Sequence, residues 1–122
     1  MTIKSFFDLY VWQVSHDFVI HVYKITQNYP EDEMYGLVSQ FRRAAVSIPA
    51  NIAEGFGKGS NKEKIHFLTI SHGSLEECRY YVILSKDLGY IQKNEETILM
   101  EKIIQISKML SACTKSLQIK QN

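Results

Sequence analysis

Residues 41–60 of the chain read FRRAAVSIPANIAEGFGKGS, and this stretch decides the fold because apolar residues recur through it at helical intervals. Pro49 stands in its middle, where a proline removes a backbone hydrogen bond and clashes with the carbonyl of Ala45, at a cost of about 3 kcal/mol. We therefore expect a kinked but continuous helix, held by apolar packing on both sides of the proline. The glycines that follow end the helix. The residues expected on its buried face are Leu37, Phe41, Ala44, Ile48 and Ile52.

A stripe of polar residues runs beside that buried face. Its members follow one another at steps of three or four, so they share one side of the helix. The stripe either faces water, as polar stripes on helices usually do, or meets a neighbouring helix. The residues of the stripe are Gln40, Arg43, Ser47, Asn51 and Glu54.

The next helix gives a reason for the second interpretation. Its apolar pattern places Ser74 and Glu77 at positions that otherwise carry apolar residues, and a carboxylate at such a position needs a cation. We hypothesise a partly buried polar layer in which Arg43, or less favourably Arg42, joins Asn51 and Glu77 and fixes the register of the two helices. The candidates for this layer are Arg42, Arg43, Asn51, Glu54, Ser74 and Glu77.

Apolar residues recur at helical intervals in three further blocks, and no strand-like alternation persists beyond a few residues. Pro30 disfavours helical geometry in the residue before it, Ser60 and Glu63 have the spacing of a helix-capping box, and Gly89 ends the third helix. The predicted fold class is all-α: one domain over residues 1–122, an antiparallel up-down-up-down four-helix bundle. The helices are expected at about residues 8–28, 34–56, 61–88 and 94–118.

The first helix carries two adjacent apolar rows, although one row is enough to meet a bundle core. Trp12, Val19 and Tyr23 belong to the second row. This row either widens the core face and leaves aromatic edges, or forms part of an oligomer surface. The third helix also has two rows, and two separate faces that meet head to tail close into a ring. Trp12, Val19 and Tyr23 are therefore candidates for a subunit interface.

The composition is that of an ordinary globular domain, with 45% hydrophobic and 22% charged residues. The formal net charge is only +1, so any binding of RNA or DNA needs a local basic patch and is expected to be weak and salt-sensitive. Such lysine clusters are more often solvated surface than nucleic-acid contacts. The candidate patch consists of Lys58, Lys62, Lys64, Lys108 and Lys115.

Cys78 and Cys113 both fall on apolar helical stripes, and the opening MTIKSFF lacks the apolar core of a signal peptide. We expect a reduced, cytoplasmic setting. No apolar run approaches the ~20 residues that would cross a bilayer, so no membrane partner is expected.

No constellation of residues indicates catalysis or a cofactor. Glu63 and His66 have the spacing used in di-iron bundles, but the second such pair that these sites need is missing. The glycines at 55, 57 and 59 lack the spacing of a phosphate-binding loop and follow a helix instead of a strand. We therefore expect a protein that is not an enzyme, with no metal and no cofactor.

A longer pattern carries a resemblance. The run YGLVSQFRRAAVSIPANIAEGFGKGS, followed by HGSLEE and LGYI and preceded by FFDLYVWQ, resembles the four-helix-bundle family of proteins encoded in intervening sequences of bacterial 23S rRNA genes. The resemblance covers about residues 6–91 and implies an all-α bundle. Similar proteins include the accessory variability protein of diversity-generating retroelements, which assembles as a five-membered ring and binds a reverse transcriptase and nucleic acid. For no residue does the resemblance imply catalysis.

Two functions follow from these observations as hypotheses. The first is a homo-oligomeric scaffold that binds a protein or ribonucleoprotein partner, with a ring of five subunits as the first choice and a dimer as the second. The second is an RNA- or DNA-binding module that uses the lysine patch.

Overall fold

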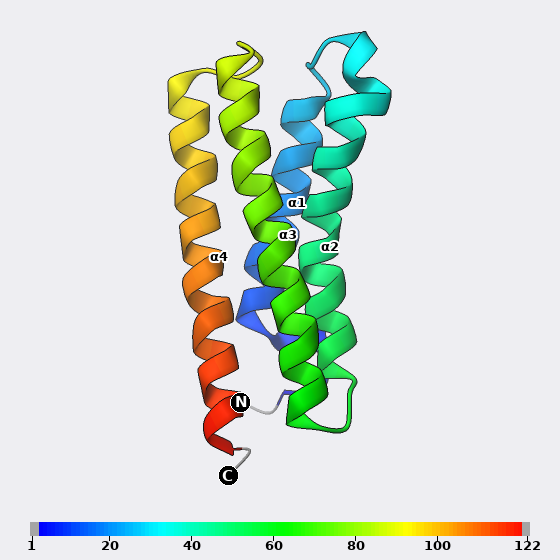
Figure 1. Cartoon of the computed structure of the whole chain (residues 1–122), viewed down its shortest axis with the longest axis vertical. Coiled ribbons are helices and arrows are strands. Elements are labelled where there is room, and N and C mark those ends of the chain that lie inside the picture. The colour runs from blue at the N-terminus through cyan, green and yellow to red at the C-terminus, as the bar shows by residue number, and fades with distance from the viewer. Residues whose placement is uncertain (1–2, 121–122) are drawn as a thin grey trace.

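The computed structural model describes residues 3–120, with side chains as far as Ile119. Four long helices lie side by side along the longest axis of the molecule, and successive helices run in opposite directions (Figure 1). Helix α2 packs between α1 and α3, and α4 packs against α3 and α1. The predicted all-α antiparallel bundle is confirmed, and residues 3–120 contain no β-strand. The helices are α1 (Tyr10–Thr26), α2 (Ser39–Phe56), α3 (Asn61–Asp87) and α4 (Lys93–Lys120).

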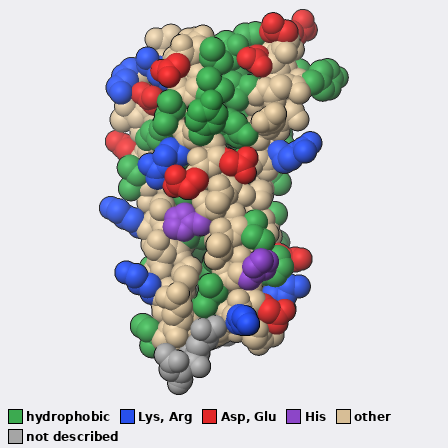
Figure 2. Space-filling model, viewed as in Figure 1, with side chains coloured by type: hydrophobic (Ala, Val, Ile, Leu, Met, Phe, Trp, Pro, Cys, Tyr) green, Lys and Arg blue, Asp and Glu red, His purple; other side chains and the backbone are tan. Residues whose placement is uncertain are grey.

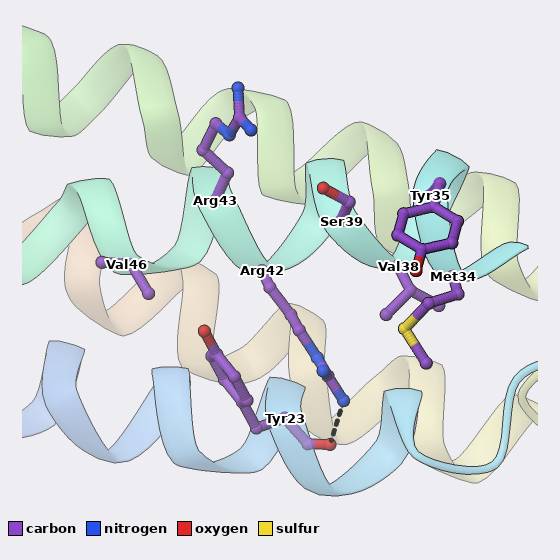
Figure 3. Close-up of a pocket in the computed structure, with 8 residues that line it drawn as sticks. All are labelled: Tyr23, Met34, Tyr35, Val38, Ser39, Arg42, Arg43 and Val46. Atoms are coloured by element: carbon purple, nitrogen blue, oxygen red, sulfur yellow. Dashed lines mark hydrogen bonds between the residues drawn. The ribbon is translucent and has the colours of Figure 1, made fainter.

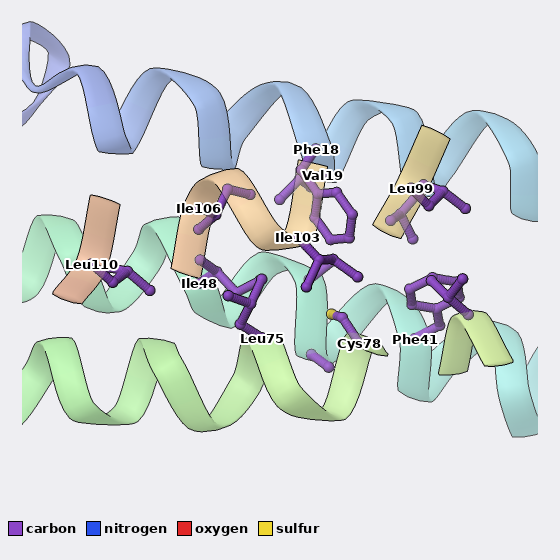
Figure 4. Packing of buried hydrophobic residues seen from close by; sticks show 14 of the residues in the cluster. Phe18, Val19, Phe41, Ile48, Leu75, Cys78, Leu99, Ile103, Ile106 and Leu110 are labelled. Carbon is purple, nitrogen blue, oxygen red and sulfur yellow. The ribbon is translucent and has the colours of Figure 1, made fainter. Parts of the chain in front are cut away.

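The core runs along the axis shared by the four helices, and every helix contributes to it (Figure 4). Phe18, Phe41, Leu75 and Ile103 have no exposed surface at all. All five residues expected on the inner face of the second helix are buried. The heptad positions of α4 are buried as well, from Leu99 to Leu110. Helical periodicity therefore identifies the core correctly.

The entries to α1 and α2 are less regular than predicted. A short turn, η1 (Phe6–Asp8), precedes α1, and Leu9 between them is extended, so the α-helix begins at Tyr10. After Pro30 the chain forms the 3-10 turn η2 (Glu31–Glu33) and the π-helical turn η3 (Met34–Val38) before α2 begins at Ser39.

The break in helical geometry lies at Gly36, whose backbone angles are φ −114° and ψ −110°. Pro49 lies inside the continuous helix α2, as the sequence predicts. Two side chains donate hydrogen bonds to backbone carbonyl oxygens of α2 directly before the proline. Ser71 Oγ donates a hydrogen bond to the carbonyl oxygen of Ile48 at 2.9 Å, and Asn51 Nδ2 donates to that of Ser47 at 2.8 Å.

None of the helices within residues 3–120 combines the length and the apolar character that a membrane span requires.

Candidate interaction surfaces

Ser47, Asn51 and Ser74 form a hydrogen-bonded cluster between α2 and α3. Asn51 Nδ2 donates to the Oγ of Ser47 at 2.9 Å, and the Oγ of Ser74 donates across the helix interface to the same Ser47 Oγ at 2.8 Å. Ser74 is buried and Asn51 is half-buried. The structure therefore brings Asn51 and Ser74 together, as in the hypothesis of a polar layer. Hydroxyl and amide groups form this layer, in place of the expected arginine and glutamate.

The charged members of the hypothesis lie outside this cluster. Arg43, Glu54 and Glu77 are exposed, and no ion pair joins Arg43 to Glu77 among the side chains described up to residue 119. Glu77 instead accepts a hydrogen bond from the Tyr81 hydroxyl at 3.3 Å. The cause is geometric: at 3.6 residues per turn Glu77 lies about 60° around α3 from the buried Ser74. It lies on the side of Ile70, which is 38% exposed, so the carboxylate stays in water.

Arg42 points to α1 and away from α3. Its Nε donates to Thr26 Oγ1 at 2.9 Å, and one terminal nitrogen donates to the carbonyl oxygen of Tyr23 at 3.3 Å (Figure 3). The guanidinium also lies over the Tyr23 ring, 4.5 Å from its centroid. Arg42 thus fastens α1 to α2 through three interactions, a role that the sequence pattern did not reveal.

Arg42 forms the floor of a shallow surface groove between α1 and α2 (Figure 3), which we call the α1–α2 groove. Its volume is about 460 Å³. Tyr35 is 97% exposed at its edge, and Met34, Val46 and Tyr23 are each at least 40% exposed. The lining residues are Tyr23, Met34, Tyr35, Val38, Ser39, Arg42, Arg43 and Val46.

A second exposed apolar region lies on α3. The exposed fraction is 38–57% for Ile70, Tyr80 and Ile83 on α3 and for Leu88, the residue directly after it. Figure 2 shows hydrophobic side chains gathered over the upper half of the face on which α3 lies. Gly73 belongs to the same side of the helix, and a Cβ added there would meet nothing within 4 Å. We call Ile70, Gly73, Tyr80, Ile83 and Leu88 the α3 outer face.

The structure changes the interface predicted for α1. Val19 is only 7% exposed and belongs to the core, so it is not available for a subunit contact. Trp12 is half-buried because η1 folds over it. The ring centroids of Phe6 and Phe7 lie 5.1 and 5.3 Å from the centroid of the Trp12 ring. The His16 ring stacks on the Trp12 ring with a centroid distance of 5.0 Å. Tyr23 is the candidate that remains exposed, in the α1–α2 groove.

Sequence reasoning missed Tyr35 and Tyr80, the two most exposed aromatic residues of these surfaces. A large aromatic side chain on the solvent side of a predicted helix is the signal that could have found Tyr80. Tyr35 has no such signal, because its exposure depends on the π-helical turn before α2.

The two groups of candidate lysines come together at one end of the bundle. The turn between α2 and α3 carries Lys58, Lys62 and Lys64. The last turns of α4, which carry Lys115, reach the same end of the bundle. A hydrogen bond links the two regions: Asn61 Nδ2 donates to the carbonyl oxygen of Leu117 at 3.4 Å. Lys108 lies about two turns further up α4, at 3.6 residues per turn. Two acids, Glu54 and Glu63, lie near the lysines of the turn, so the patch has only a small excess of positive charge.

Two of these lysines already have partners within the subunit. Lys64 Nζ donates to the carbonyl oxygen of Phe56 at 3.2 Å, and Lys58 Nζ lies 5.2 Å from the centroid of the Phe67 ring. Lys62, Lys108 and Lys115 are exposed.

Titratable side chains meet across α1 and α4 at His21, whose Nε2 lies 3.3 Å from Glu95 Oε2 and whose Nδ1 lies 3.2 Å from Lys102 Nζ. Within residues 3–119 no group of three or more His, Cys, Asp or Glu side chains is placed to hold a metal ion. Cys78 and Cys113 are free thiols, and burial raises the pKa of both, so both are protonated near neutral pH. His72 faces Ser107 across α3 and α4 at 3.0 Å.

Comparisons with known proteins agree with this architecture. A solved structure from Bacteroides thetaiotaomicron, a protein of unknown function from the S23 ribosomal protein family, is similar in fold: the TM-score is 0.79 at 24% sequence identity, over 86% of this chain and 95% of that one. No curated protein matches the chain. The family model for the 23S rRNA-intervening sequence protein matches residues 7–112. Since this match spans most of the chain, the protein belongs to the 23S rRNA-intervening sequence protein family.

Proposed function

We propose that this protein is a non-enzymatic, cytoplasmic scaffold that assembles as a homo-oligomer and binds a protein or ribonucleoprotein partner. The observation that carries the proposal is that large apolar side chains are exposed on two separate faces, the α1–α2 groove and the α3 outer face. Grouped apolar exposure of this kind marks interaction surfaces in globular proteins.

The two faces favour a closed ring. The α1–α2 groove and the α3 outer face consist of different residues and lie on different sides of α2. In a head-to-tail arrangement, the groove of one subunit therefore contacts the α3 outer face of the next subunit. Five subunits are the first choice, because one similar protein, the accessory variability protein of diversity-generating retroelements, forms a ring of five. A dimer, which needs one self-complementary face, is the second choice.

Gly73 supports a contact at the α3 outer face. A glycine inside a helix costs about 1 kcal/mol relative to alanine, and nothing within 4 Å of this position requires one in the isolated subunit. Close approach of a neighbouring subunit gives the missing steric reason.

Paired variants test the head-to-tail arrangement. Tyr35→Glu damages one face and Tyr80→Glu the other, so each variant alone is expected to be monomeric, while an equimolar mixture forms heterodimers through the one pair of intact faces. Native mass spectrometry reads both states. Ile104→Glu is the matched control, because Ile104 is 44% exposed on α4 outside both faces.

The results separate the alternatives. If one of the two variants still assembles fully, only one face is used and the dimer replaces the ring. If both variants keep the mass of the unmodified protein, the two faces do not carry assembly.

A nucleic-acid-binding module is the second candidate, favoured by the convergence of Lys58, Lys62, Lys64 and Lys115 at one end of the bundle. Binding through these lysines releases counterions, so affinity falls steeply as salt rises. A gel-shift titration at low salt tests this, with Lys58→Glu/Lys62→Glu expected to abolish the shift. Absence of any shift with RNA or DNA at low salt removes this candidate.

A further inference from the structure

The end of the bundle near the α2–α3 turn contains a cavity that follows from the unequal lengths of the helices. Helix α1 has 17 residues and α4 has 28, so at 1.5 Å per residue they are about 26 and 42 Å long. The last turns of α4 therefore extend beyond the start of α1. The irregular segment before α1, instead of a helix, covers the apolar side of these turns.

The cavity left under this segment has a volume of about 540 Å³, within the range of about 300–1,000 Å³ typical of small-molecule sites. Its walls come from all four helices and the N-terminal segment. Val11, Ile52 and Leu68 form its inner walls and are 2–8% exposed. Ala112 and Ser116 line it at exposed positions of α4, so the cavity opens to solvent.

Among the side chains described from residue 3 to residue 119, Lys64 is the one charged residue that lines this cavity. Its ammonium has three N–H donors, and one hydrogen bond within the subunit is found for it, to the carbonyl oxygen of Phe56 at 3.2 Å. The nearest acid in sequence, Glu63, instead accepts a hydrogen bond from the Ser60 hydroxyl at 3.0 Å. Lys64 therefore has donors left for an anionic group at the edge of an apolar space.

We propose that this cavity binds a free single-chain carboxylic acid of the fatty-acid class, with the alkyl chain against the inner walls and the carboxylate on the Lys64 ammonium. An apolar interior beside one cation complements an amphiphile with an apolar chain and one negative charge. This site is separate from the α1–α2 groove and from the α3 outer face, so it does not depend on assembly.

Cys113 lines the cavity and gives a built-in reporter. Its thiol is half-buried, whereas Cys78 is fully buried in the core and serves as the internal control. Alkylation of each thiol by N-ethylmaleimide at pH 8 is followed by mass spectrometry of the intact protein and its peptides. Saturating sodium dodecanoate, kept below its micelle-forming concentration, is expected to slow alkylation of Cys113 about tenfold and to leave Cys78 unchanged.

A chain-length series from octanoate to tetradecanoate tests whether the acid occupies a bounded cavity. Each buried methylene group increases affinity about fourfold, so affinity rises along the series and then reaches a plateau when the cavity is full. Lys64→Gln is expected to weaken dodecanoate binding about tenfold through loss of the charged partner. Ala112→Trp, a change at an exposed position, is expected to abolish protection by filling the mouth while helicity stays the same.

Four results would overturn the proposal. The first is that no acid of the series slows alkylation of Cys113, and the second is that dodecanoate protects Cys78 as well as it protects Cys113. The third is that Ala112→Trp leaves the protection of Cys113 unchanged. The fourth is that dodecyltrimethylammonium, whose head group is cationic, protects Cys113 as well as dodecanoate does. Phosphatidylglycerol vesicles that protect Cys113 better than free dodecanoate would assign the site to a membrane lipid and overturn the assignment to a free acid.

Discussion

Arg42→Ala is expected to destabilise the bundle, whereas the neighbouring Arg43→Ala is not. Arg42 Nε donates to Thr26 Oγ1 at 2.9 Å and its guanidinium lies 4.5 Å from the centroid of the Tyr23 ring, while Arg43 is exposed. The charge-assisted hydrogen bond contributes about 1.5 kcal/mol and the cation–π contact about 0.5 kcal/mol. The free energy of unfolding should therefore fall by about 2 kcal/mol in Arg42→Ala.

The loss stays moderate because no buried donor is left without an acceptor. Thr26 Oγ1 keeps its own hydrogen bond to the carbonyl oxygen of Val22 at 2.7 Å when Arg42 is removed. Arg43→Ala is the matched control, with a change within about 0.5 kcal/mol, as is usual for surface substitutions.

Urea denaturation followed by circular dichroism at 222 nm measures both variants. Because assembly shifts apparent stability, all samples are compared at the same subunit concentration and their masses in solution are checked. The midpoint should fall in Arg42→Ala with an unchanged dependence on urea. If Arg43→Ala costs as much as Arg42→Ala, or if Arg42→Ala costs less than about 0.5 kcal/mol, then Arg42 does not fasten α1 to α2 in the way described.

Three further predictions concern single residues. Glu77→Ala should change the free energy of unfolding by less than about 0.5 kcal/mol, because this carboxylate is exposed and has no cationic partner among the described side chains. Thermal unfolding measures the change. A loss of several kcal/mol would support the hypothesis of a buried ion pair instead. Gly73→Ala should stabilise the dissociated subunit by about 0.5–1 kcal/mol, since a Cβ there meets nothing within 4 Å; a destabilised monomer in urea denaturation contradicts this. Burial raises the pKa of the Tyr29 hydroxyl, so its contribution to stability is fully present below the unfolded-state pKa of about 10 and is lost as pH rises above it. In Tyr29→Phe, stability measured from pH 9 to 11 should therefore fall less steeply than in the unmodified protein, and an equal slope refutes this assignment.

The fold could be predicted from the sequence because the period of apolar residues sets which side of each helix is buried. Phe41, Ile48 and Ile52 are buried where the 3.6-residue period places them, and α2 continues through Pro49. The irregular start of α2 was not predictable in the same way. The non-helical backbone at Gly36 has no periodic signal, and the exposure of Tyr35 depends on it.

The partners of polar side chains were predicted less well, for a geometric reason. Periodicity gives the direction of a side chain around its own helix, but it does not say which neighbouring helix lies there. Asn51 and Ser74 are linked through Ser47 at the α2–α3 interface. Arg42, which the sequence pattern assigns to the same interface, lies against α1. Trp12 was interpreted as surplus surface because the sequence pattern did not show that η1 folds over it.

The central claim is that the chain assembles through two different faces, and the mass of the purified, unmodified protein in solution tests it most directly. Multi-angle light scattering after size-exclusion chromatography at micromolar subunit concentration is expected to give a mass near five times the 14.1 kDa subunit. A mass of two subunits would select the dimer and remove the ring. A mass of 14.1 kDa, unchanged as the concentration rises, would contradict the account of assembly.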